Sequence, residues 1–168
     1  MFDPKVYTNR RNQLRNEISE GLVLILGNPE APFNYPSNTY HFRQDSSFLY
    51  FFGLDHADLA GVMDVDNDRD IIFGDDVDMD DIIWMGPHPS MKERAARVGV
   101  SDARPLKDLP DILNKAKSEG RTIHFLPPYR GETYMQIENL LDIPIGNISH
   151  NASVELIKGV VKLRSVKD

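Results

Sequence analysis

The stretch that most constrains the fold is Leu22 to Leu26, which reads LVLIL and contains no polar residue. Five apolar residues are too few to span a membrane, and the glycines on either side separate them from their neighbours. A short apolar run of this kind is typical of a strand buried on both faces, in the middle of a sheet with helices on each side. The sequence therefore favours a sheet covered by helices.

The segments on either side of this strand agree with that prediction. Asp3 followed by Pro4 is an N-cap signature, and apolar residues at helical spacing predict a helix from there to Gly21. Acidic turn residues between two apolar runs predict a β-hairpin over residues 59–74. Further strands are expected at 47–52 and 122–126, helices at 90–99, 106–119 and 132–141, and an irregular loop at 27–38. The fold class is α/β, with a mixed β-sheet flanked by helices.

Composition narrows the possible functions. The chain has 168 residues, of which 40% are hydrophobic, and this size and composition fit one globular domain. A net charge of -7 argues against nucleic-acid binding, because such proteins carry a basic surface. The absence of cysteine excludes disulfides and thiolate metal sites. With no signal sequence or apolar span, we expect a cytoplasmic protein that does not bind a membrane.

The end of the chain suggests a second structural unit. Residues 152–168 have apolar residues at helical spacing, at Val154, Ile157, Val161 and Leu163, and reach Asp168 without a C-cap signal. We therefore expect a domain over residues 1–150. Residues 151–168 are interpreted as a linker helix that leads to a catalytic domain absent from this chain.

A polar run lies directly against the aromatic segment at 47–52. Arg43, Gln44, Asp45 and Ser46 precede SFLYFF, and Gly53 follows it. Polar residues at the entrance of a strand could line a substrate crevice. The alternative is structural: Arg43 and Asp45 would satisfy the buried end of a strand through hydrogen bonds. We favour the structural role.

Other groups of polar residues give no complete site. Alternating carboxylates at 64–70 resemble the start of a calcium loop, but Arg69 and Asp75 occupy positions that need glycine and glutamate. A second acidic run at 75–81 contains no histidine, and the five histidines are scattered singly. No catalytic residue and no metal ligand is expected here. Trp84, the only tryptophan, is either a core or interface residue or part of a substrate wall.

Several of these motifs occur in an order that resembles a known family. The sequences YHFRQDSSFLYFFGL, GVMDVDNDRDIIFGDD and IIWMGPHPSMKERAARVGV resemble the N-terminal domain of the aminopeptidase P, prolidase and creatinase group. The resemblance implies a ribonuclease H-like α/β domain. It also implies a parent enzyme that removes the residue before a proline with two divalent metal ions, typically manganese. In the family the metal ligands belong to the C-terminal domain, so none is carried over to this chain.

The resemblance also implies a role for the domain itself. In aminopeptidase P enzymes it mediates contacts in a homo-oligomer and helps to shape the cleft for proline-containing peptides. Only Trp84 matches a family position with such a role, as a residue of the substrate wall or an oligomer contact. GPHPS after Trp84 replaces a more basic stretch of some relatives. This chain alone is expected to be inactive.

Three alternatives to the aminopeptidase interpretation remain open. The parent could be a prolidase, which cleaves dipeptides. The domain could be a protein-binding module, since the fold is also similar to a domain of certain histone chaperones. A free-standing ribonuclease H-like enzyme would need clustered carboxylates at the strand ends.

Overall fold

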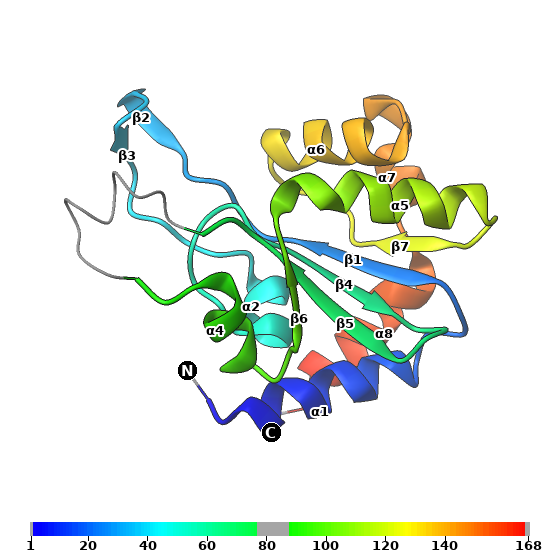
Figure 1. The fold of residues 1–168 in the computed structure, drawn as a ribbon. Coiled ribbons are helices and arrows are strands. Elements are labelled where there is room, and N and C mark those ends of the chain that lie inside the picture. The colour runs from blue at the N-terminus through cyan, green and yellow to red at the C-terminus, as the bar shows by residue number, and fades with distance from the viewer. Residues whose placement is uncertain (1, 77–87, 167–168) are drawn as a thin grey trace.

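A five-stranded mixed sheet forms the centre of the molecule (Figure 1). The computed structural model describes residues 2–76 and 88–166, so Trp84 and the acidic residues Asp78, Asp80 and Asp81 lie outside the described residues. The strands follow the order β6-β5-β4-β1-β7. Their bounds are β1 Leu22–Leu26, β4 Ala60–Asp64, β5 Arg69–Phe73, β6 Asp102–Arg104 and β7 Ile123–Phe125.

The strand β1 lies inside this sheet, as its sequence predicts. It pairs with β4 antiparallel, from Leu22 opposite Asp64 to Leu26 opposite Ala60, and with β7 parallel. β4 and β5 form the predicted antiparallel hairpin, and β6 lies parallel to β5. Successive side chains of β1 enter two separate cores, Val23 and Ile25 on one face and Leu22 and Leu24 on the other. The period of two along a strand produces this division.

Helices cover both faces of the sheet and make three layers (Figure 1). The bounds on one face are α1 Pro4–Arg15, α2 Ser46–Phe52, α4 Met91–Ala96 and α8 Val154–Arg164. Those on the other face are α5 Leu109–Ser118, preceded by a 3-10 turn Leu106–Asp108, with α6 Gly131–Leu141 and α7 Ile145–Asn151. Each layer of helices contributes to one of the two cores, and the sheet contributes to both. The fold class is the predicted one, an α/β domain with a mixed, helix-flanked sheet.

The prediction of a strand at residues 47–52 is wrong, because this segment forms the helix α2. Asp45 is its N-cap, and its Oδ1 accepts hydrogen bonds from the backbone N–H groups of Ser47 and Phe48 at 2.9 and 2.8 Å. Gly53 ends the helix with a φ of 66°. A run of aromatic residues has a high strand propensity, but two caps eight residues apart favour a short helix with Phe48 and Phe52 stacked one turn apart.

Gly53 is required at its position for two reasons. Its left-handed φ is costly for residues with a Cβ atom. A Cβ at this position would also lie 2.3 Å from Cζ of the Tyr7 ring. The close approach allows α1 to pack against the end of α2.

Two further predictions need correction. The segment 27–38 is not wholly irregular, because β2 Pro32–Tyr35 and β3 Asn38–Thr39 form a two-stranded antiparallel hairpin. The first helix ends at Arg15 and does not reach Gly21. Helical spacing continued as far as Ile18, which is buried although it follows the end of the helix.

The C-terminal helix α8 packs on the domain with a face that only partly matches the predicted one. Of the predicted apolar residues, Val154 and Val161 are exposed and Leu163 packs partly against the core, whereas Leu156 and Val160 are buried in the core beside α1. Gly159 allows the close approach, since a Cβ there would lie 3.0 Å from Cδ1 of Leu14. The helix thus completes the domain's core. Its predicted role as a linker to a further domain stays a prediction.

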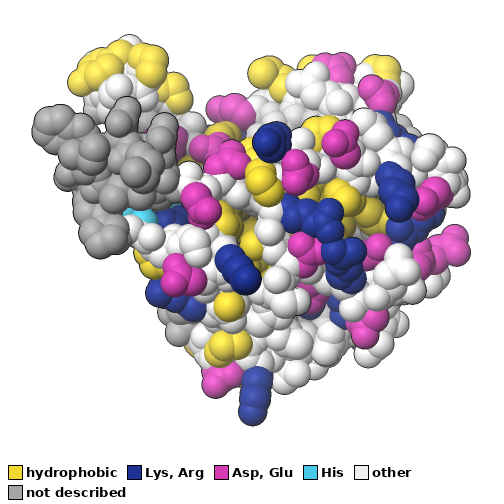
Figure 2. All heavy atoms as spheres, in the orientation of Figure 1, with side chains coloured by type: hydrophobic (Ala, Val, Ile, Leu, Met, Phe, Trp, Pro, Cys, Tyr) yellow, Lys and Arg dark blue, Asp and Glu magenta, His cyan; other side chains and the backbone are white. Residues whose placement is uncertain are grey.

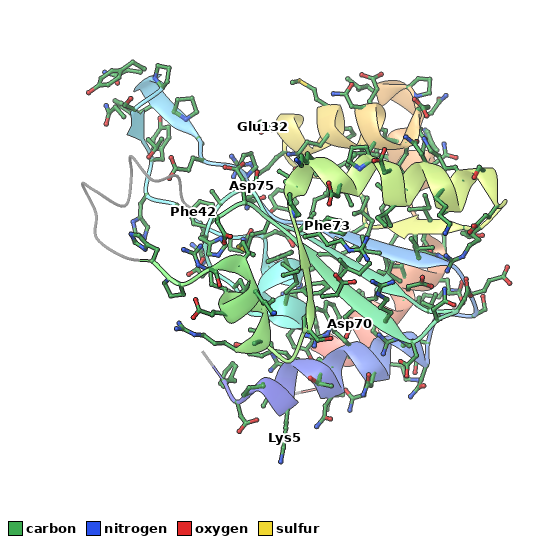
Figure 3. The ribbon with its side chains drawn as sticks, in the orientation of Figure 1. Lys5, Phe42, Asp70, Phe73, Asp75 and Glu132 are labelled. Carbon is green, nitrogen blue, oxygen red and sulfur yellow. The ribbon has the colours of Figure 1, made fainter. Side chains whose placement is uncertain are left out.

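Two arginines of α1, Arg11 and Arg15, have a structural role. Arg11 is fully buried and donates from Nε to Asp70 of β5 at 2.7 Å and from Nη1 to the carbonyl of Phe51 at 2.8 Å. Arg15 also binds Asp70, at 2.5 Å. Figure 3 shows Asp70 at the end of β5 nearest α1. Burial lowers the pKa of Arg11 and the Asp70 carboxylate opposes this change. These arginines therefore fix α1 to the sheet.

Candidate functional surface at the loop edge of the sheet

The polar residues singled out from the sequence lie at the edge of the sheet where β1 and β7 end and β4 begins. The connections 27–31, 40–45, 53–59 and 126–130 meet there. The carboxyl ends of parallel strands are the usual place for ligand-binding loops in α/β sheets. We therefore describe this edge, and the hairpin that extends from it, as the candidate functional surface.

Gln44 joins three of these connections. Its side chain is buried, and Oε1 accepts hydrogen bonds from the backbone N–H groups of Asn28 and Asp45, both at 2.8 Å. Its Nε2 donates to the carbonyl of His56 at 2.7 Å. The polar capacity of the amide is therefore used inside the domain. A catalytic role for Gln44 is not compatible with this arrangement.

Asp45 joins α2 to the loop after β7. One carboxylate oxygen caps α2, and the other accepts a hydrogen bond from the Tyr129 hydroxyl at 3.0 Å. Burial, together with the Asp45 carboxylate, raises the pKa of Tyr129, while a hydrogen bond with Asn28 opposes this change. The hydroxyl therefore stays protonated and donating at neutral pH. The structural role predicted for Asp45 agrees with these contacts.

Arg43 and Ser46 contribute less than the sequence suggested. The Arg43 side chain is exposed, and its contribution comes from the backbone, whose carbonyl accepts from Nδ2 of Asn28 at 2.9 Å. Ser46 is also exposed, and its Oγ accepts a bond from Arg164 of α8 at 3.3 Å. The idea that the Arg43 guanidinium satisfies a strand end is therefore wrong. Gln44, which received no role of its own from the sequence, makes those contacts.

The hairpin β2–β3 carries an exposed aromatic surface. Phe33, Tyr35 and Tyr40 are 60, 57 and 58% exposed, and the rings of Phe33 and Tyr40 meet edge to face at 4.9 Å. The hairpin extends away from the three layers (Figure 1), and Figure 2 shows apolar side chains gathered at its tip. Sequence analysis missed this surface because the Pro, Asn and Gly residues of the segment indicated only a loop. The sequence signal that could have indicated this surface is the presence of three aromatic residues, Phe33, Tyr35 and Tyr40, within a polar segment.

The carboxylates of the hairpin β4–β5 bind arginine and do not form a metal site. Asp64 and Asp66 both contact Arg121, and Asp68 and Asp70 both contact Arg15. Although burial opposes the change, hydrogen bonds from Arg121 and Asn67 lower the pKa of Asp64. Among residues 2–76 and 88–166, no group of three or more His, Cys, Asp or Glu side chains could hold a metal ion.

The remaining sequence candidates are dispersed. Asp75 and Asp76 accept backbone hydrogen bonds from Leu106 and Met91, so they cap the turns that follow. The histidines differ in exposure: His41, His88 and His150 are exposed, His124 is buried, and His56 is partly buried. Trp84 lies outside the described residues, so its predicted place in a substrate wall stays a prediction. In the part of the chain that the structure describes, no helix is both long and apolar enough to cross a membrane.

Two comparisons with solved structures give the same fold. The chain superimposes on aminopeptidase P from Escherichia coli in its low-pH form with a TM-score of 0.69 and 19% identity, covering 84% of this chain and 33% of that one. The aminopeptidase PepP of Pseudomonas aeruginosa gives a TM-score of 0.71 at 18% identity, over 90% of this chain and 35% of that one. At this identity the likeness establishes the fold.

Curated relatives match a smaller part of the chain. A probable Xaa-Pro aminopeptidase of Aspergillus clavatus is 32% identical over 95 residues, which cover 56% of this chain and 19% of the relative. One from Metarhizium acridum is 26% identical over 113 residues, or 66% of this chain and 22% of the relative. The chain thus spans about a fifth of the length of these relatives.

The family comparison covers most of the domain. The model described as "Aminopeptidase P, N-terminal domain" matches residues 7–124, which run from α1 through the sheet to β7. This range includes Gln44, Asp45 and the aromatic hairpin, so most of the candidate surface lies within the matched region, whereas the connection 126–130 with Tyr129 lies beyond it. The chain belongs to the aminopeptidase P N-terminal domain family.

Proposed function

We propose that this chain is the non-catalytic N-terminal part of an Xaa-Pro aminopeptidase, a hydrolase that releases the residue before a proline. The family match and the relatives named Xaa-Pro aminopeptidase support this proposal. The small share of those relatives that the chain spans supports placing the chemistry in another part of the parent protein.

The observation that carries the proposal is the use of the carboxylates. A pair of divalent ions would need several carboxylates or histidines directed at one point. Asp64, Asp70 and Asp102 instead form ion pairs with arginine. The residues described here do not fit a two-metal centre, and we derive no reaction step through one.

We further propose that this domain contributes a contact surface, either to a second subunit or to the substrate cleft. The aromatic hairpin β2–β3 supports this proposal, since exposed clusters of aromatic side chains are enriched at protein contacts. The hairpin extends beyond the layers and could therefore reach a neighbouring subunit (Figure 1). Proline rings also pack well on aromatic surfaces, so a proline-containing peptide is a compatible ligand.

A hydrolysis assay tests the catalytic part of the proposal. The chain alone and the same chain joined to the following part of its gene product are incubated with an Xaa-Pro tripeptide, with manganese and with a chelator. We expect release of the first residue only from the longer protein, and only with the metal. Hydrolysis by the 168-residue chain would contradict the proposal. A longer protein that cleaves only Xaa-Pro dipeptides, and not tripeptides or larger peptides, would also contradict it.

A hairpin variant tests the contact role. Replacing Phe33, Tyr35 and Tyr40 by serine in the longer protein removes the aromatic surface and leaves both cores intact. We expect a smaller oligomer by light scattering or a raised KM. Met135→Ser, at an exposed apolar residue of α6, is the control and is expected to change neither. If the longer protein assembles and binds its substrate equally well without the aromatic side chains, the hairpin has no contact role.

A protein-binding module of the same fold is the second candidate, and the same hairpin favours it. A longer protein that is inactive on every Xaa-Pro peptide, and that loses a protein partner on hairpin substitution, would establish this alternative.

A further inference from the structure

A cleft of about 540 Å³ lies beside α4 and shares no lining residue with the aromatic hairpin. Two of its lining residues, Leu54 and His56, accept hydrogen bonds from the Gln44 amide through their backbone carbonyls. The start of α1, the end of α2, the connection after Gly53 and the helix α4 enclose it. The residues that matter for its chemistry are Tyr7, Leu49, Leu54, His56, Arg94 and Arg97. Its volume lies in the range of small-molecule sites, roughly 300 to 1,000 Å³.

The inner surface of the cleft is apolar. Tyr7 and Leu54 are buried members of the core, and they line its inner part. Leu49 and Phe2 are 40 and 64% exposed and lie at its mouth. The cleft can therefore remove an apolar group from water, at roughly 25 cal/mol for each Å² buried.

Two arginines bring positive charge to this apolar surface. Arg94 and Arg97 are three residues apart at the end of α4, and within the described ranges neither lies within 4.0 Å of a carboxylate. Most arginines elsewhere in these ranges do form ion pairs: Arg11, Arg15, Arg69, Arg104, Arg121 and Arg130. In a chain of net charge -7, two guanidinium groups that line one cleft and form no ion pair within 4.0 Å provide a place for an anion, although the charge of Arg97 also acts on Glu93.

His56 adds a buried polar atom without a partner. Among the described residues its Nε2 makes no hydrogen bond, and its Nδ1 lies 3.4 Å from the carbonyl of Ala57. Burial, followed by the Arg94 charge, lowers the pKa of His56, while the Ala57 carbonyl and then Asp55 oppose this change. The ring is therefore neutral at pH 7, and it senses the charge of Arg94.

We propose that this cleft binds a monocarboxylate carried on an apolar or aromatic body. The carboxylate lies against Arg94 and Arg97, and the body lies on Tyr7, Leu49 and Leu54. Asp55 also lines the cleft and is exposed, so two guanidiniums and one carboxylate leave a single excess positive charge. One excess charge matches a monocarboxylate better than a phosphate dianion. The inference does not depend on the proposed function, because the cleft shares no residue with the hairpin.

A titration of the 168-residue chain by NMR tests the site. The probe is 3-phenylpropionate, and 3-phenylpropionamide is the matched ligand of nearly the same shape without charge. We expect saturable shifts of the amides of residues 49–56 and 91–97 with the acid, and at least tenfold weaker binding of the amide. Inorganic phosphate is expected to bind at least tenfold more weakly than the acid.

Variants connect the binding to the two arginines. Arg94→Gln and Arg97→Gln together are expected to weaken 3-phenylpropionate at least tenfold. Arg43→Gln, which removes another exposed arginine, is the control and should leave the affinity within twofold. Thermal unfolding of each variant checks that the fold is retained. If the double variant unfolds, each single substitution is measured instead, and each should weaken binding about threefold or more.

The His56 ring gives a readout that a general loss of structure would not reproduce. A bound carboxylate offsets the charge of Arg94, so the pKa of His56 should rise when the cleft is saturated. By linkage, the affinity should increase as the pH falls through that pKa. A ligand on the outer surface would leave the titration of His56 unchanged.

Clear results would overturn the proposal. The first is the absence of a saturable shift at 10 mM 3-phenylpropionate. The others are equal affinity for the acid and the amide, equal affinity for the acid and phosphate, and an unchanged affinity for the acid in the double glutamine variant. A peptide ending in phenylalanine, with a free or an amidated C-terminus, distinguishes the two sources of the carboxylate. Tighter binding of the free peptide than of 3-phenylpropionate identifies a peptide terminus as the ligand, and weaker binding identifies a small organic acid.

Discussion

At the scale of single residues, the loop edge shows how one buried amide can organise several connections. Gln44 accepts two backbone hydrogen bonds and donates others, and Asp45 divides its two carboxylate oxygens between a helix N-cap and Tyr129. The sequence placed both residues in a polar run beside apolar residues and predicted a structural role. It assigned the guanidinium of Arg43 the part that Gln44 plays, because arginine has more donors. The need of the Asn28 and Asp45 N–H groups for an acceptor becomes visible only when the loops are placed.

Gln44→Ala should destabilise the domain far more than Arg43→Ala. The alanine leaves the buried N–H of Asn28 and the partly buried N–H of Asp45 without an acceptor, at about 1 to 3 kcal/mol each, so we expect a loss of about 2 to 6 kcal/mol in the free energy of unfolding. Arg43→Ala, at an exposed side chain, should change it by less than about 0.5 kcal/mol. Urea unfolding followed by circular dichroism measures both. Similar losses for the two variants would disprove the role given to Gln44.

At the scale of elements, the residues at the ends of a helix determined the type of secondary structure where the hydrophobic pattern did not. The aromatic segment after Asp45 has a strand-like composition, yet an N-cap and a left-handed glycine eight residues later make it the helix α2. In α8 the spacing was helical as predicted, but the buried face is the one that contains Leu156 and Val160. Several apolar stripes are possible on a helix with many apolar residues. The surface of α1, including Leu14 opposite Gly159, selects one of them.

Leu156→Ala and Val154→Ala test the face that α8 buries. Leu156 is fully buried, so its truncation should cost about 2 to 5 kcal/mol in the free energy of unfolding. Val154 is 63% exposed, and its truncation should cost less than about 0.5 kcal/mol. Thermal or urea unfolding of the chain distinguishes the two. A larger effect at Val154 would mean that α8 packs through the face first predicted from the sequence.

At the scale of the whole molecule, arginine–carboxylate pairs connect segments that are distant in the sequence. Arg121 joins the start of β7 to the β4–β5 turn, Arg11 joins α1 to β5, and Arg69 and Arg104 meet at Asp102. Figure 2 shows acidic and basic side chains interspersed over this face of the domain. The acidic residues that looked like a possible metal loop in the sequence are therefore part of the domain's internal connections.

These pairs predict a loss of stability in acid. Although burial opposes the change, hydrogen bonds from arginine lower the pKa of Asp64 and Asp102 below their ordinary value of 3.8 in the folded state. Their contribution is therefore present above pH 3.8 and is lost as the pH falls through the lower, folded pKa. The pKa of His56 is lowered from 6.5, so a separate contribution is lost as the pH falls from 6.5.

Urea unfolding at a series of pH values from 7 to 3 measures both losses. Asp64→Asn should flatten the dependence in the acid range and leave the range near pH 6 unchanged, whereas His56→Gln should do the reverse. A free energy of unfolding that is constant between pH 7 and pH 3 would contradict both assignments.

The sequence by itself determined the fold class, the central position of β1, the β4–β5 hairpin and the family. These depend on local signals, namely short apolar runs, turn residues and caps, together with the order of motifs. The tertiary structure alone decided that residues 46–52 form a helix, which face α8 buries, that Gln44 holds the loop edge, and that Arg94, Arg97 and His56 share one cleft. The reason is physical: helix caps, buried hydrogen bonds and unpaired charges depend on groups that are far apart in the chain, and a sequence does not show which of them meet.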